Sequence, residues 1–471
     1  ESSYYYDLPD SDLDLSFTSD NTDRSLSPRS SLARSSLTLS LGSGESRLSG
    51  SSATAHSSAV HSAHRRPHRR HGNANWTAMD AATTLSSDGD LHLRHLKLVR
   101  LVGSGNLGRV FLCRLRDYDG ADFALKVVDR DNLSAKKLSH VQTEAKILSH
   151  LDHPFLPTLY AHLEVSHYTC LLMDYCSNGD LHSLLRKQPA HRFSVAAVRF
   201  FAAEVLLALE YLHSQGIVYR DLKPENILIR EDGHVMLSDF DLCFRSDVSP
   251  KLEVNSKMIT ARSTCFNQRR REERSTVFVA EPTAALSKSC VGTHEYLAPE
   301  ILSGNGHGNG VDWWAFGILI YELLYGTTPF KGASKDSTLR NIASARGIRF
   351  PAPATEAERI DPGMADARDL IEKLLAKDPR QRLGCAIGAT DIKRHPFFNG
   401  LKWPLIRTYR PPEIRGLAVK RSKSKTQSAG SSTPRRRRHV WRRVSRNLMN
   451  KLRNYRSTVN PNCNYFSDSS K

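Results

Sequence analysis

Several features that would place this chain outside the cell or across a membrane are missing from its sequence. The most apolar run, 196–212, contains Arg199, Glu204 and Glu210, so it predicts a buried helix rather than a transmembrane span. The eight cysteines include no Cys-x-x-Cys pair, which argues against a disulfide framework and a zinc site. The first residues are acidic and tyrosine-rich, whereas a signal peptide is basic and then apolar. We therefore expect a reducing, intracellular environment and at most peripheral contact with a membrane.

Acidic residues are too few to balance the basic ones. The 471-residue chain has 67 Lys and Arg against 49 Asp and Glu, which gives a formal net charge of +18. A surplus of this size implies an anionic partner, such as a membrane surface, a nucleic acid or an acidic protein. Binding to nucleic acid would rest on net charge alone, because the chain has neither zinc-finger spacing nor an aromatic–basic stacking module. We therefore expect no nucleic-acid partner.

Residues 1–94 are rich in Ser, Thr, Asp and Arg and have few aliphatic side chains after Leu15. Such a segment buries too little apolar surface to offset the entropy lost on ordering, so we expect it to be disordered. All but one residue of 64–71 are His or Arg. This run could bind a metal or a polyanion, but a solvated run of charge is the simpler interpretation.

Residues 95–398 have the patterns of an α+β domain. Strand-like runs at 96–102, 110–113 and 123–127 are followed by a helical period over 133–150. Beyond residue 175 the pattern is mostly helical, with apolar-faced segments near 195–213, 311–325 and 366–376. The outline is a strand-rich small lobe followed by a helix-rich large lobe. The stretch from about 247 to 286 is polar, Arg-rich and without clear periodicity, which predicts a loop insertion.

The glycines at 103, 105 and 108 match Gly-x-Gly-x-x-Gly, which is a weak signal alone. The alternatives are a tight hairpin and a dinucleotide fingerprint, and the latter needs a helix directly after the glycines. Here 110–115 is strand-like, so the glycines join two strands and let backbone amides approach triphosphate oxygens. The expected nucleotide-binding residues in this turn are Val102, Gly103, Ser104, Gly105, Asn106, Leu107, Gly108, Arg109 and Val110.

A lysine on the next predicted strand strengthens this interpretation. Lys126 lies sixteen residues after Val110, where it can reach the α- and β-phosphates. A buried lysine needs an anion to fix it, and Glu144 on the following predicted helix is the candidate. The alternative for Glu144 is an exposed helix carboxylate.

The decisive segment is 219–226, Tyr-Arg-Asp-Leu-Lys-Pro-Glu-Asn. Phosphoryl transfer demands positioning and charge neutralisation more than covalent chemistry. Asp221 can accept the proton of a substrate hydroxyl, Lys223 can contact the moving phosphoryl group, and Asn226 can hold one Mg²⁺. Asp239, eighteen residues beyond Asp221, heads Asp-Phe-Asp and can chelate the bridging Mg²⁺ ions. Each residue alone could be an exposed polar side chain without a functional role, but the ordered set predicts transfer of the γ-phosphoryl group of ATP.

These motifs occur in the order typical of protein kinases, and 95–398, which ends past Ala-Pro-Glu at 298–300, resembles that superfamily throughout. Tyr219, the Gly-Thr pair at 292–293 and the tail 399–416 with its Pro-Pro resemble the AGC class. Asp241 in place of glycine and the insertion before residue 298 are similar to the plant-specific AGC subgroup. The resemblance is closest to the PINOID group and its WAG-type members, in which the acidic, serine-rich "DLDLSFTS" of 12–19 recurs.

The resemblance implies a bilobal kinase fold that uses ATP and Mg²⁺ and phosphorylates Ser or Thr. It implies that adenine lies between Ala124, the gatekeeper Met173 and the backbone of Asp174 and Cys176.

The resemblance also assigns roles outside the nucleotide site. Ser289 would be an activation-loop phosphosite that pairs with Arg220. Thr293 would contact Asp221, Asp312 would brace the catalytic loop, and Glu300 would pair with Arg382. Arginines before the target residue would be received by Asp180, Glu225 and Glu322.

Two positions depart from the family pattern. Asp241 cannot adopt the positive φ of a glycine at low cost, so we expect the magnesium loop to flip out less readily. Residues 463–467, Cys-Asn-Tyr-Phe-Ser, lack the full Phe-x-x-Phe docking motif of many AGC kinases. Activation through that motif by an upstream kinase is therefore not expected.

The basic C-terminal extension, 417–471, contains one amphipathic segment. After four arginines at 435–438, an apolar helical face is formed by Trp441, Val444, Leu448, Leu452 and Tyr455. A basic amphipathic helix favours an anionic membrane surface or a calmodulin-like partner, and the alternatives are a nuclear-import signal and an inert tail. We expect a peripheral plasma-membrane and cytoplasmic location, with the nucleus as the alternative. Arg262 and the arginines at 269–271 in the insertion could add to the same contact.

Two classes of function fit the sequence. An active kinase of the PINOID group would act on protein substrates with basic residues near the target, such as the cytosolic loops of PIN-type auxin efflux carriers, and so regulate auxin transport. A pseudokinase scaffold would use the basic tail to recruit partners. The scaffold is disfavoured because Lys126, Asp221, Asn226 and Asp239 are all present.

Overall fold

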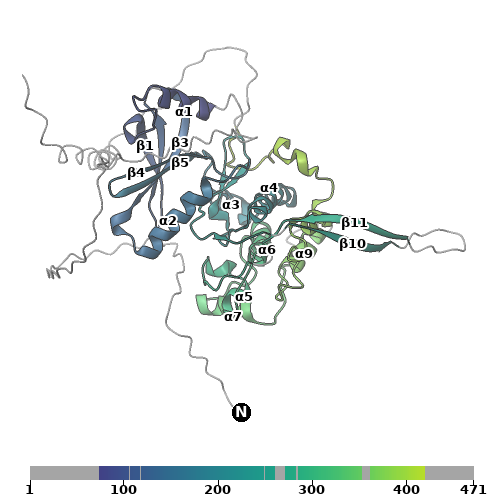
Figure 1. The fold of residues 1–471 in the computed structure, drawn as a ribbon. Coiled ribbons are helices and arrows are strands. Elements are labelled where there is room, and N and C mark those ends of the chain that lie inside the picture. The colour runs from purple at the N-terminus through teal and green to yellow at the C-terminus, as the bar shows by residue number, and fades with distance from the viewer. Residues whose placement is uncertain are drawn as a thin grey trace, which may run out of the picture.

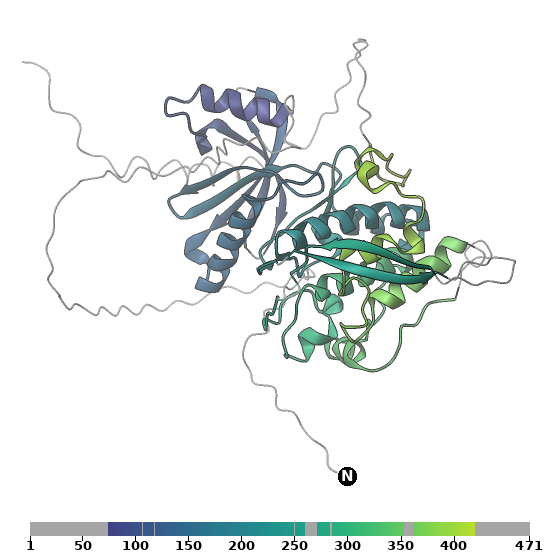
Figure 2. The same cartoon turned by 45° about the vertical axis from the view of Figure 1, so that its right-hand side comes forward.

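The computed structural model describes residues 74–105, 107–116, 118–248, 250–259, 271–282, 285–352 and 361–419. These residues form a small lobe built on one β-sheet and a larger, mostly helical lobe, which are distinct in Figures 1 and 2. The chain passes from the small lobe to the large one after residue 174, where the last strand of the sheet ends. The predicted bilobal α+β fold is therefore confirmed.

The small lobe is a five-stranded antiparallel sheet with strand order β1-β2-β3-β5-β4. Its strands are β1 (Leu96–Ser104), β2 (Arg109–Leu115), β3 (Tyr118–Asp129), β4 (Leu159–Val165) and β5 (Tyr168–Asp174). Helix α2 (Ala135–Leu148) begins at Ser134, whose hydroxyl accepts a hydrogen bond from the amide of Lys137. Val141 of α2 packs with Val128 of β3 and with Leu107, so the helix supports the glycine turn.

An additional helix, α1 (Ala74–Thr84), packs against β3. The prediction that all of 1–94 is disordered is therefore wrong for this part of the segment. Ala78 and Met79 are buried under the sheet, and the ring of Trp76 lies 5.0 Å from that of Tyr160 on β4. A short helix gains little stability from its own sequence and needs a partner surface. Composition could not reveal that surface, because it is provided by the outer face of the sheet.

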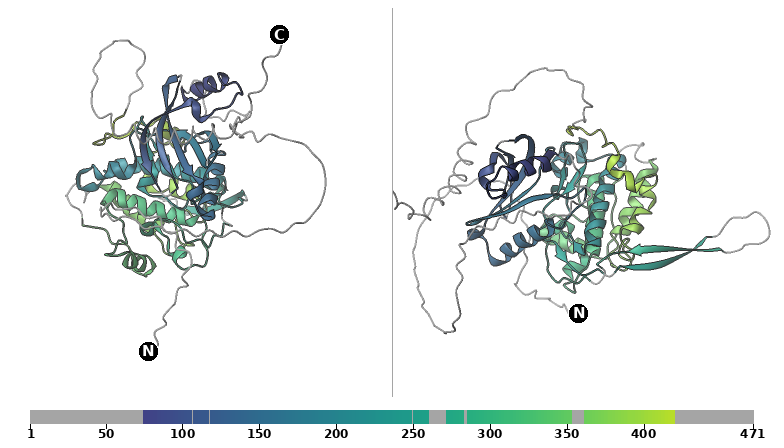
Figure 3. Two further views of the ribbon diagram at one scale, coloured as in Figure 1. Left: turned by 90° about the vertical axis from the view of Figure 1, so that its left-hand side faces the viewer. Right: turned by 45° about the horizontal axis from the view of Figure 1, so that its top comes forward.

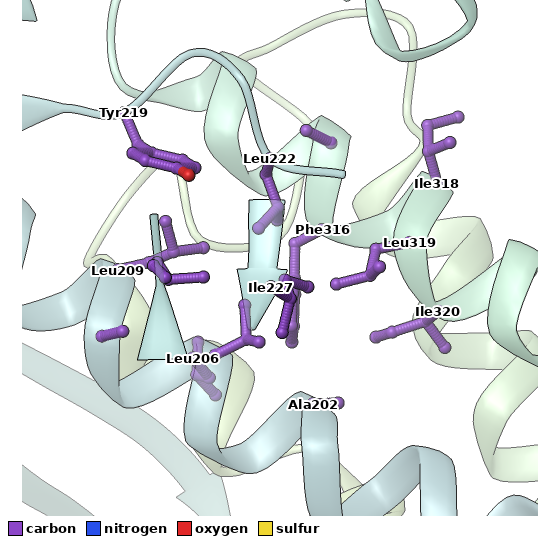
Figure 4. Packing of buried hydrophobic residues seen from close by; sticks show 14 of the residues in the cluster. Ala202, Leu206, Leu209, Tyr219, Leu222, Ile227, Phe316, Ile318, Leu319 and Ile320 are labelled. Atoms are coloured by element: carbon purple, nitrogen blue, oxygen red, sulfur yellow. The ribbon is translucent and has the colours of Figure 1, made fainter. Parts of the chain in front are cut away.

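The large lobe is built around two long helices, α4 (Val195–Ser214) and α6 (Gly310–Tyr325). The buried helix predicted for 196–212 is confirmed as α4. Around these two lie α3 (Leu181–Arg186), α5 (Pro299–Leu302), α7 (Lys335–Ala343), α9 (Pro362–Leu374) and α10 (Ala389–Lys393). Figure 4 shows the core from close by. Leu206 and Leu209 of α4 and Phe316 of α6 pack with Leu222 and Ile227, which lie in and directly after the segment 219–226. Burying such side chains contributes about 1.5–3 kcal/mol each.

Short elements hold the loops between these helices. Strand β6 (Ile217–Val218) pairs with β9 (Phe244–Arg245), and β7 (Ile227–Ile229) pairs with β8 (Val235–Leu237). The 3₁₀ turns are η1 (Leu93–His95), η2 (Arg130–Asn132), η3 (Pro189–His191), η4 (Pro224–Asn226), η5 (His294–Tyr296), η6 (Pro396–Phe398) and η7 (Trp403–Thr408). The two strand pairs flank residues 219–226 and 239–241, so they fix both ends of the segments that carry the chemistry.

The insertion is a hairpin rather than the predicted loop. Strands β10 (Lys251–Ile259) and β11 (Arg271–Val279) pair antiparallel from Lys251↔Val279 to Ile259↔Arg271. Figure 3 shows this ribbon projecting away from the large lobe. Backbone hydrogen bonds can hold such a ribbon without a buried face, so its sequence does not need the alternation of apolar residues on which a strand prediction relies.

The C-terminal tail lies along the large lobe. Gln188 donates a hydrogen bond to the carbonyl of Arg415, Asn178 donates to that of Ala418, and Arg407 forms an ion pair with Asp232. The basic segment 435–456 and the "DLDLSFTS" segment lie outside the described residues. Within the part of the chain that is described, none of the helices has both the length and the apolar character needed to cross a bilayer.

Candidate active site

Lys126 is buried, with its charge balanced by two carboxylates, one from α2 and one from the loop after β8. The predicted ion pair is present, because Lys126 Nζ is 2.8 and 2.7 Å from the two carboxylate oxygens of Glu144 on α2. The same nitrogen lies 3.2 Å from Asp239 Oδ1. Burial favours a neutral lysine, but Glu144 and Asp239 outweigh it and raise the pKa of Lys126. The lysine is therefore a fixed cation next to the predicted magnesium ligand.

The catalytic loop gathers its side chains around Asp221. The amide nitrogen of Asn226 donates to Asp221 Oδ2 at 2.8 Å, and the hydroxyl of Thr293 donates to Asp221 Oδ1 at 3.1 Å. Lys223 Nζ lies 2.9 Å from Asp221 and donates to the Thr293 hydroxyl at 2.9 Å. The contact predicted between Thr293 and Asp221 is therefore present. It holds the carboxylate of Asp221 in one orientation.

The two predicted magnesium ligands, Asn226 and Asp239, each offer an oxygen atom. Asp239 presents a carboxylate that is partly exposed in the cleft. Asn226 uses its amide nitrogen to hold Asp221, which leaves its amide oxygen as the ligand atom. Magnesium prefers such oxygen ligands and keeps several waters or phosphate oxygens of its own. The donor set therefore fits a magnesium ion that is shared with a nucleotide.

Two residues of the site have a left-handed backbone. Arg220 has φ 66° and Asp239 has φ 59°, a region that non-glycine residues adopt at a cost of about 1–3 kcal/mol. Asp241 is not among the described non-glycine residues with positive φ. The backbone conformation at residue 241 is therefore one that a residue other than glycine can adopt without strain. Burial and the charge of Asp239 raise the pKa of Asp241 to about 7.

The brace predicted for the catalytic loop is present. Asp312 on α6 is fully buried, and its carboxylate accepts the amides of Tyr219 and Arg220 at 2.8 Å each. Glu300 and Arg382 form the other predicted pair, with nitrogen–oxygen distances of 2.6 and 2.9 Å. Because Arg382 is buried, this bidentate pair fixes the end of the activation segment to the large lobe.

The predicted adenine-binding residues lie on β3, on β5 and in the segment that follows β5. Ala124 of β3 is directly opposite Met173 of β5, and Cys176 is buried with its sulfur 3.7 Å from that of Met236. Gly105 and Gly108 close the glycine turn through one backbone hydrogen bond of 2.9 Å. A Cβ at Gly108 would lie 2.4 Å from the carbonyl oxygen of Val127, so only glycine fits there. Asn106 lies outside the described residues.

With both serines unmodified, Arg220 binds Ser287. Its Nη1 donates to the hydroxyl of Ser287 at 2.9 Å, and its Nε donates to the carbonyl of Leu242. Ser289 is exposed, and its amide donates to the Ser287 hydroxyl at 3.3 Å. The prediction that phosphorylated Ser289 pairs with Arg220 remains a prediction. The signal for Ser287 was the Ser-x-Ser pattern of 287–289, in which either hydroxyl has the right chemistry.

The acidic residues predicted to receive basic substrates lie on three elements of the large lobe. Asp180 caps α3 and accepts the amide of Ser183 at 2.6 Å. Glu225 lies 3.2 Å from His182. Glu322 on α6 accepts a hydrogen bond from the hydroxyl of Tyr296. Burial, Glu225 and Glu295 raise the pKa of Glu322 to about 7 despite that hydrogen bond.

Two contacts were missed at the sequence level. Lys126 contacts Asp239 as well as Glu144, although Asp239 lies 113 positions after Lys126 in the sequence. His213, which follows the apolar run 196–212, is fully buried beside Asp312. Spacing does not predict the first contact, because it depends on how the lobes fold together. The second has a weak signal, since a histidine at the end of an apolar helix needs a polar partner inside the core.

Comparison with known proteins agrees with this geometry. Residues 96–398 match the protein kinase domain family. The chain is 60% identical to serine/threonine-protein kinase WAG1 of Arabidopsis thaliana over 97% of both chains. It is 59% identical to WAG2 of the same plant over 98% of this chain and 96% of that one. Protein kinase PINOID of Oryza sativa subsp. japonica is 49% identical over 75% of this chain and 76% of its own length. The chain therefore belongs to the protein kinase family, as an ATP-dependent serine/threonine kinase of the plant AGC class and the WAG-type branch of the PINOID group.

Proposed function

We propose that this kinase phosphorylates serine and threonine residues that follow basic residues, that its substrates are the cytosolic loops of PIN-type auxin efflux carriers, and that it thereby regulates auxin transport. Resemblance to the PINOID group suggests the carriers. The observation that supports a basic substrate is the pair of carboxylates, Glu225 of η4 and Glu322 of α6, the first of which helps to raise the pKa of the second. Their mutual repulsion is relieved when a guanidinium group lies between them.

Asp221 is the proposed acceptor of the proton of the substrate hydroxyl. We infer that its carboxylate takes the hydroxyl proton, because Asn226 and Thr293 fix its two oxygens while lysine, not another carboxylate, lies beside it. Bound Mg–ATP supplies the phosphoryl group and a good leaving group. Lys126 and Lys223 are each held by an ion pair, with Glu144 and Asp221 respectively, so neither would need to reorganise to stabilise the charge on the phosphates during transfer.

The experiment that tests the substrate is a phosphosite map. The purified kinase is incubated with Mg–ATP and the cytosolic loop of a PIN-type carrier, and the phosphorylated residues are identified by mass spectrometry. We expect serines or threonines preceded by Arg or Lys, and we expect Glu322→Gln to lose these sites selectively. Glu372→Gln, which changes an exposed carboxylate on α9, is the matched control and should reproduce the wild-type map. Phosphorylation at sites with acidic flanks in the wild type would rule the proposal out.

The wild-type kinase and Glu322→Gln should differ in how the KM for a basic peptide depends on pH. The pKa of Glu322 is about 7, so its charged form is about tenfold more populated at pH 8 than at pH 6. The KM for an arginine-containing peptide should therefore rise by up to about tenfold as the pH falls through 7, because the protonated acid no longer attracts a cation. In Glu322→Gln, KM should be high and independent of pH over this range. A peptide without basic residues serves as the second control.

We also propose that the kinase is held peripherally at anionic membranes by residues 435–456. The apolar face of that segment is too small to hold a protein alone, and arginine attraction decays within a Debye length of about 8 Å at physiological salt. Vesicles with anionic lipid should therefore bind the full chain, neutral vesicles should not, and salt should release it. Trp441→Ala with Leu448→Ala should weaken binding at constant charge. A nuclear-import signal would depend on the arginines and not on these two apolar side chains. Full vesicle binding by the double variant would therefore contradict the two-part membrane anchor and favour the nuclear-import interpretation.

A further inference from the structure

A fully buried histidine on α4 lies between two carboxylates. His213 Nδ1 is 2.9 Å from Glu281 Oε2, and its Nε2 is 2.8 Å from Asp312 Oδ2. The side chains of His213 and Asp312 have no exposed surface, and that of Glu281 is 6% exposed. Three ionisable groups removed from water in one row need each other's charges, so this arrangement is built to be held together.

One end of this row reaches the catalytic loop. Asp312 uses the oxygen that binds His213 to accept the Tyr219 amide as well, and its other oxygen accepts the Arg220 amide. Arg220 has a left-handed backbone and directly precedes Asp221. A strained residue keeps its conformation only while its surroundings hold it. The orientation of Asp312 therefore bears on where Asp221 points.

The other end of the row belongs to the insertion. Glu281 follows β11 by two residues, at the base of the projecting hairpin. Its Oε2 also accepts the side-chain amide of Asn309 at 2.7 Å. Gly388, with φ 71°, leaves room for this carboxylate, since a Cβ there would lie 1.9 Å from Glu281 Oε1. Glu281 is thus fixed by groups from α4, the start of α6 and the turn before α10.

The charges of the row agree with its geometry. Burial disfavours a charged imidazole, but Glu281 and Asp312, the ionisable groups that face it, outweigh burial and raise the pKa of His213 to about 9. At neutral pH both ring nitrogens therefore carry a proton and donate, one to each carboxylate. Removing Glu281 leaves one N–H without an acceptor and frees the ring to change its angle toward Asp312.

We propose that Glu281 is a positioning residue for phosphoryl transfer: it holds His213, which orients Asp312, which in turn fixes the backbone of the catalytic loop at Tyr219 and Arg220. The insertion then contributes to catalysis through its base alone. The ribbon beyond the base is free to serve other purposes without disturbing the reaction.

The test compares Glu281→Ala, Glu281→Gln and a shortened hairpin, each in the full chain. In the last, Val254 and Thr276, which are opposite each other, are joined by Asn-Gly in place of 255–275, a two-residue turn suited to an antiparallel pair. With Mg–ATP and a soluble basic peptide, Glu281→Ala should lower kcat about tenfold with KM for ATP changed less than about twofold, because the loop is misplaced while the nucleotide pocket is intact. Glu281→Gln, which keeps an acceptor, should restore most of kcat, and the shortened hairpin should match the wild type.

A structural readout separates positioning from general destabilisation. Amide hydrogen exchange at Tyr219 and Arg220 should be at least about tenfold faster in Glu281→Ala, while exchange in β4 stays unchanged. Wild-type kcat in Glu281→Ala, or a fall in kcat without faster exchange at these two amides, would overturn the proposal. If Glu281→Ala does not fold, Asn309→Ala removes one donor to Glu281 and should produce smaller changes of the same kind. Unchanged kcat and exchange in that variant would equally overturn it.

Discussion

Asp221→Asn should lower kcat by about 10²–10⁴-fold, because the amide cannot take the proton of the substrate hydroxyl. The substitution preserves the shape of the side chain. Its amide oxygen can still accept from Asn226, and the Thr293 hydroxyl can reverse its role and accept from the new amide. The loss should therefore lie in the chemical step rather than in folding or nucleotide affinity. The measurement is kcat for a soluble basic peptide beside the Kd of a non-hydrolysable nucleotide.

Asp336→Asn is the matched control, since Asp336 is an exposed carboxylate in the first turn of α7. It should change neither kcat nor the nucleotide Kd. A wild-type rate in Asp221→Asn would show that another group takes the proton. A large loss of nucleotide binding would instead mean that the substitution disturbed the pocket. Either result would contradict the role given to Asp221.

The chemistry of the site could be predicted from sequence because each group has its own motif along the chain. Lys126, Asp221, Asn226 and Asp239 each lie in or beside a short stretch whose local structure is fixed by near neighbours, such as the glycine turn or the pairing of β7 with β8. Order and spacing are then enough to assign them. Asp312 and Arg382 were assigned through the family resemblance alone, and both are buried in the structure.

What could not be predicted depends on surfaces that exist only after folding. Helix α1 is ordered by the face of the sheet it covers, and a segment of eleven residues is too short to be a stable helix by itself. The hairpin of β10 and β11 is held by backbone pairing, which leaves little trace in side-chain pattern. The Ser-x-Ser pattern of 287–289 does not say which hydroxyl binds Arg220, because the path of the backbone brings Ser287 to the guanidinium.

The contact between Lys126 and Asp239 belongs to the same class. It joins β3 of the small lobe to the loop after β8 of the large lobe, so it reports how the lobes are arranged relative to each other. With Glu144 also on Lys126, the three charges tie α2, the sheet and the magnesium loop together in one place. In this structure the lysine, its helix carboxylate and the predicted magnesium ligand are therefore in contact with one another.

Lys126→Met should abolish detectable phosphoryl transfer and also destabilise the fold. The activity is lost because no cation remains to hold the nucleotide phosphates. The stability is lost for a separate reason. Glu144, whose side chain is 2% exposed, keeps its charge without its partner, and an unsatisfied buried group of this kind costs about 1–3 kcal/mol or more. The measurements are kcat with a basic peptide and the free energy of unfolding in urea.

A second substitution separates these two effects. Glu144→Leu in the Lys126→Met background removes the unpaired charge and replaces it with an apolar side chain among the buried residues of α2. Stability should return toward that of the wild type, while activity should stay at zero, because the cation is still missing. If the double variant is no more stable than Lys126→Met, the buried carboxylate is not the cause of the instability.

The pH dependence gives an independent check on the same cause. Burial raises the pKa of Glu144, and without Lys126 only the hydrogen bond from the backbone amide of Phe240 opposes that effect. A raised folded-state pKa in an acid means that the ionised form is the destabilised one. The stability deficit of Lys126→Met should therefore be largest at high pH and shrink as the pH falls through the raised pKa and Glu144 becomes neutral. In the double variant this dependence should vanish. A deficit that stays constant with pH would point to lost packing of the lysine stem rather than to an unpaired charge.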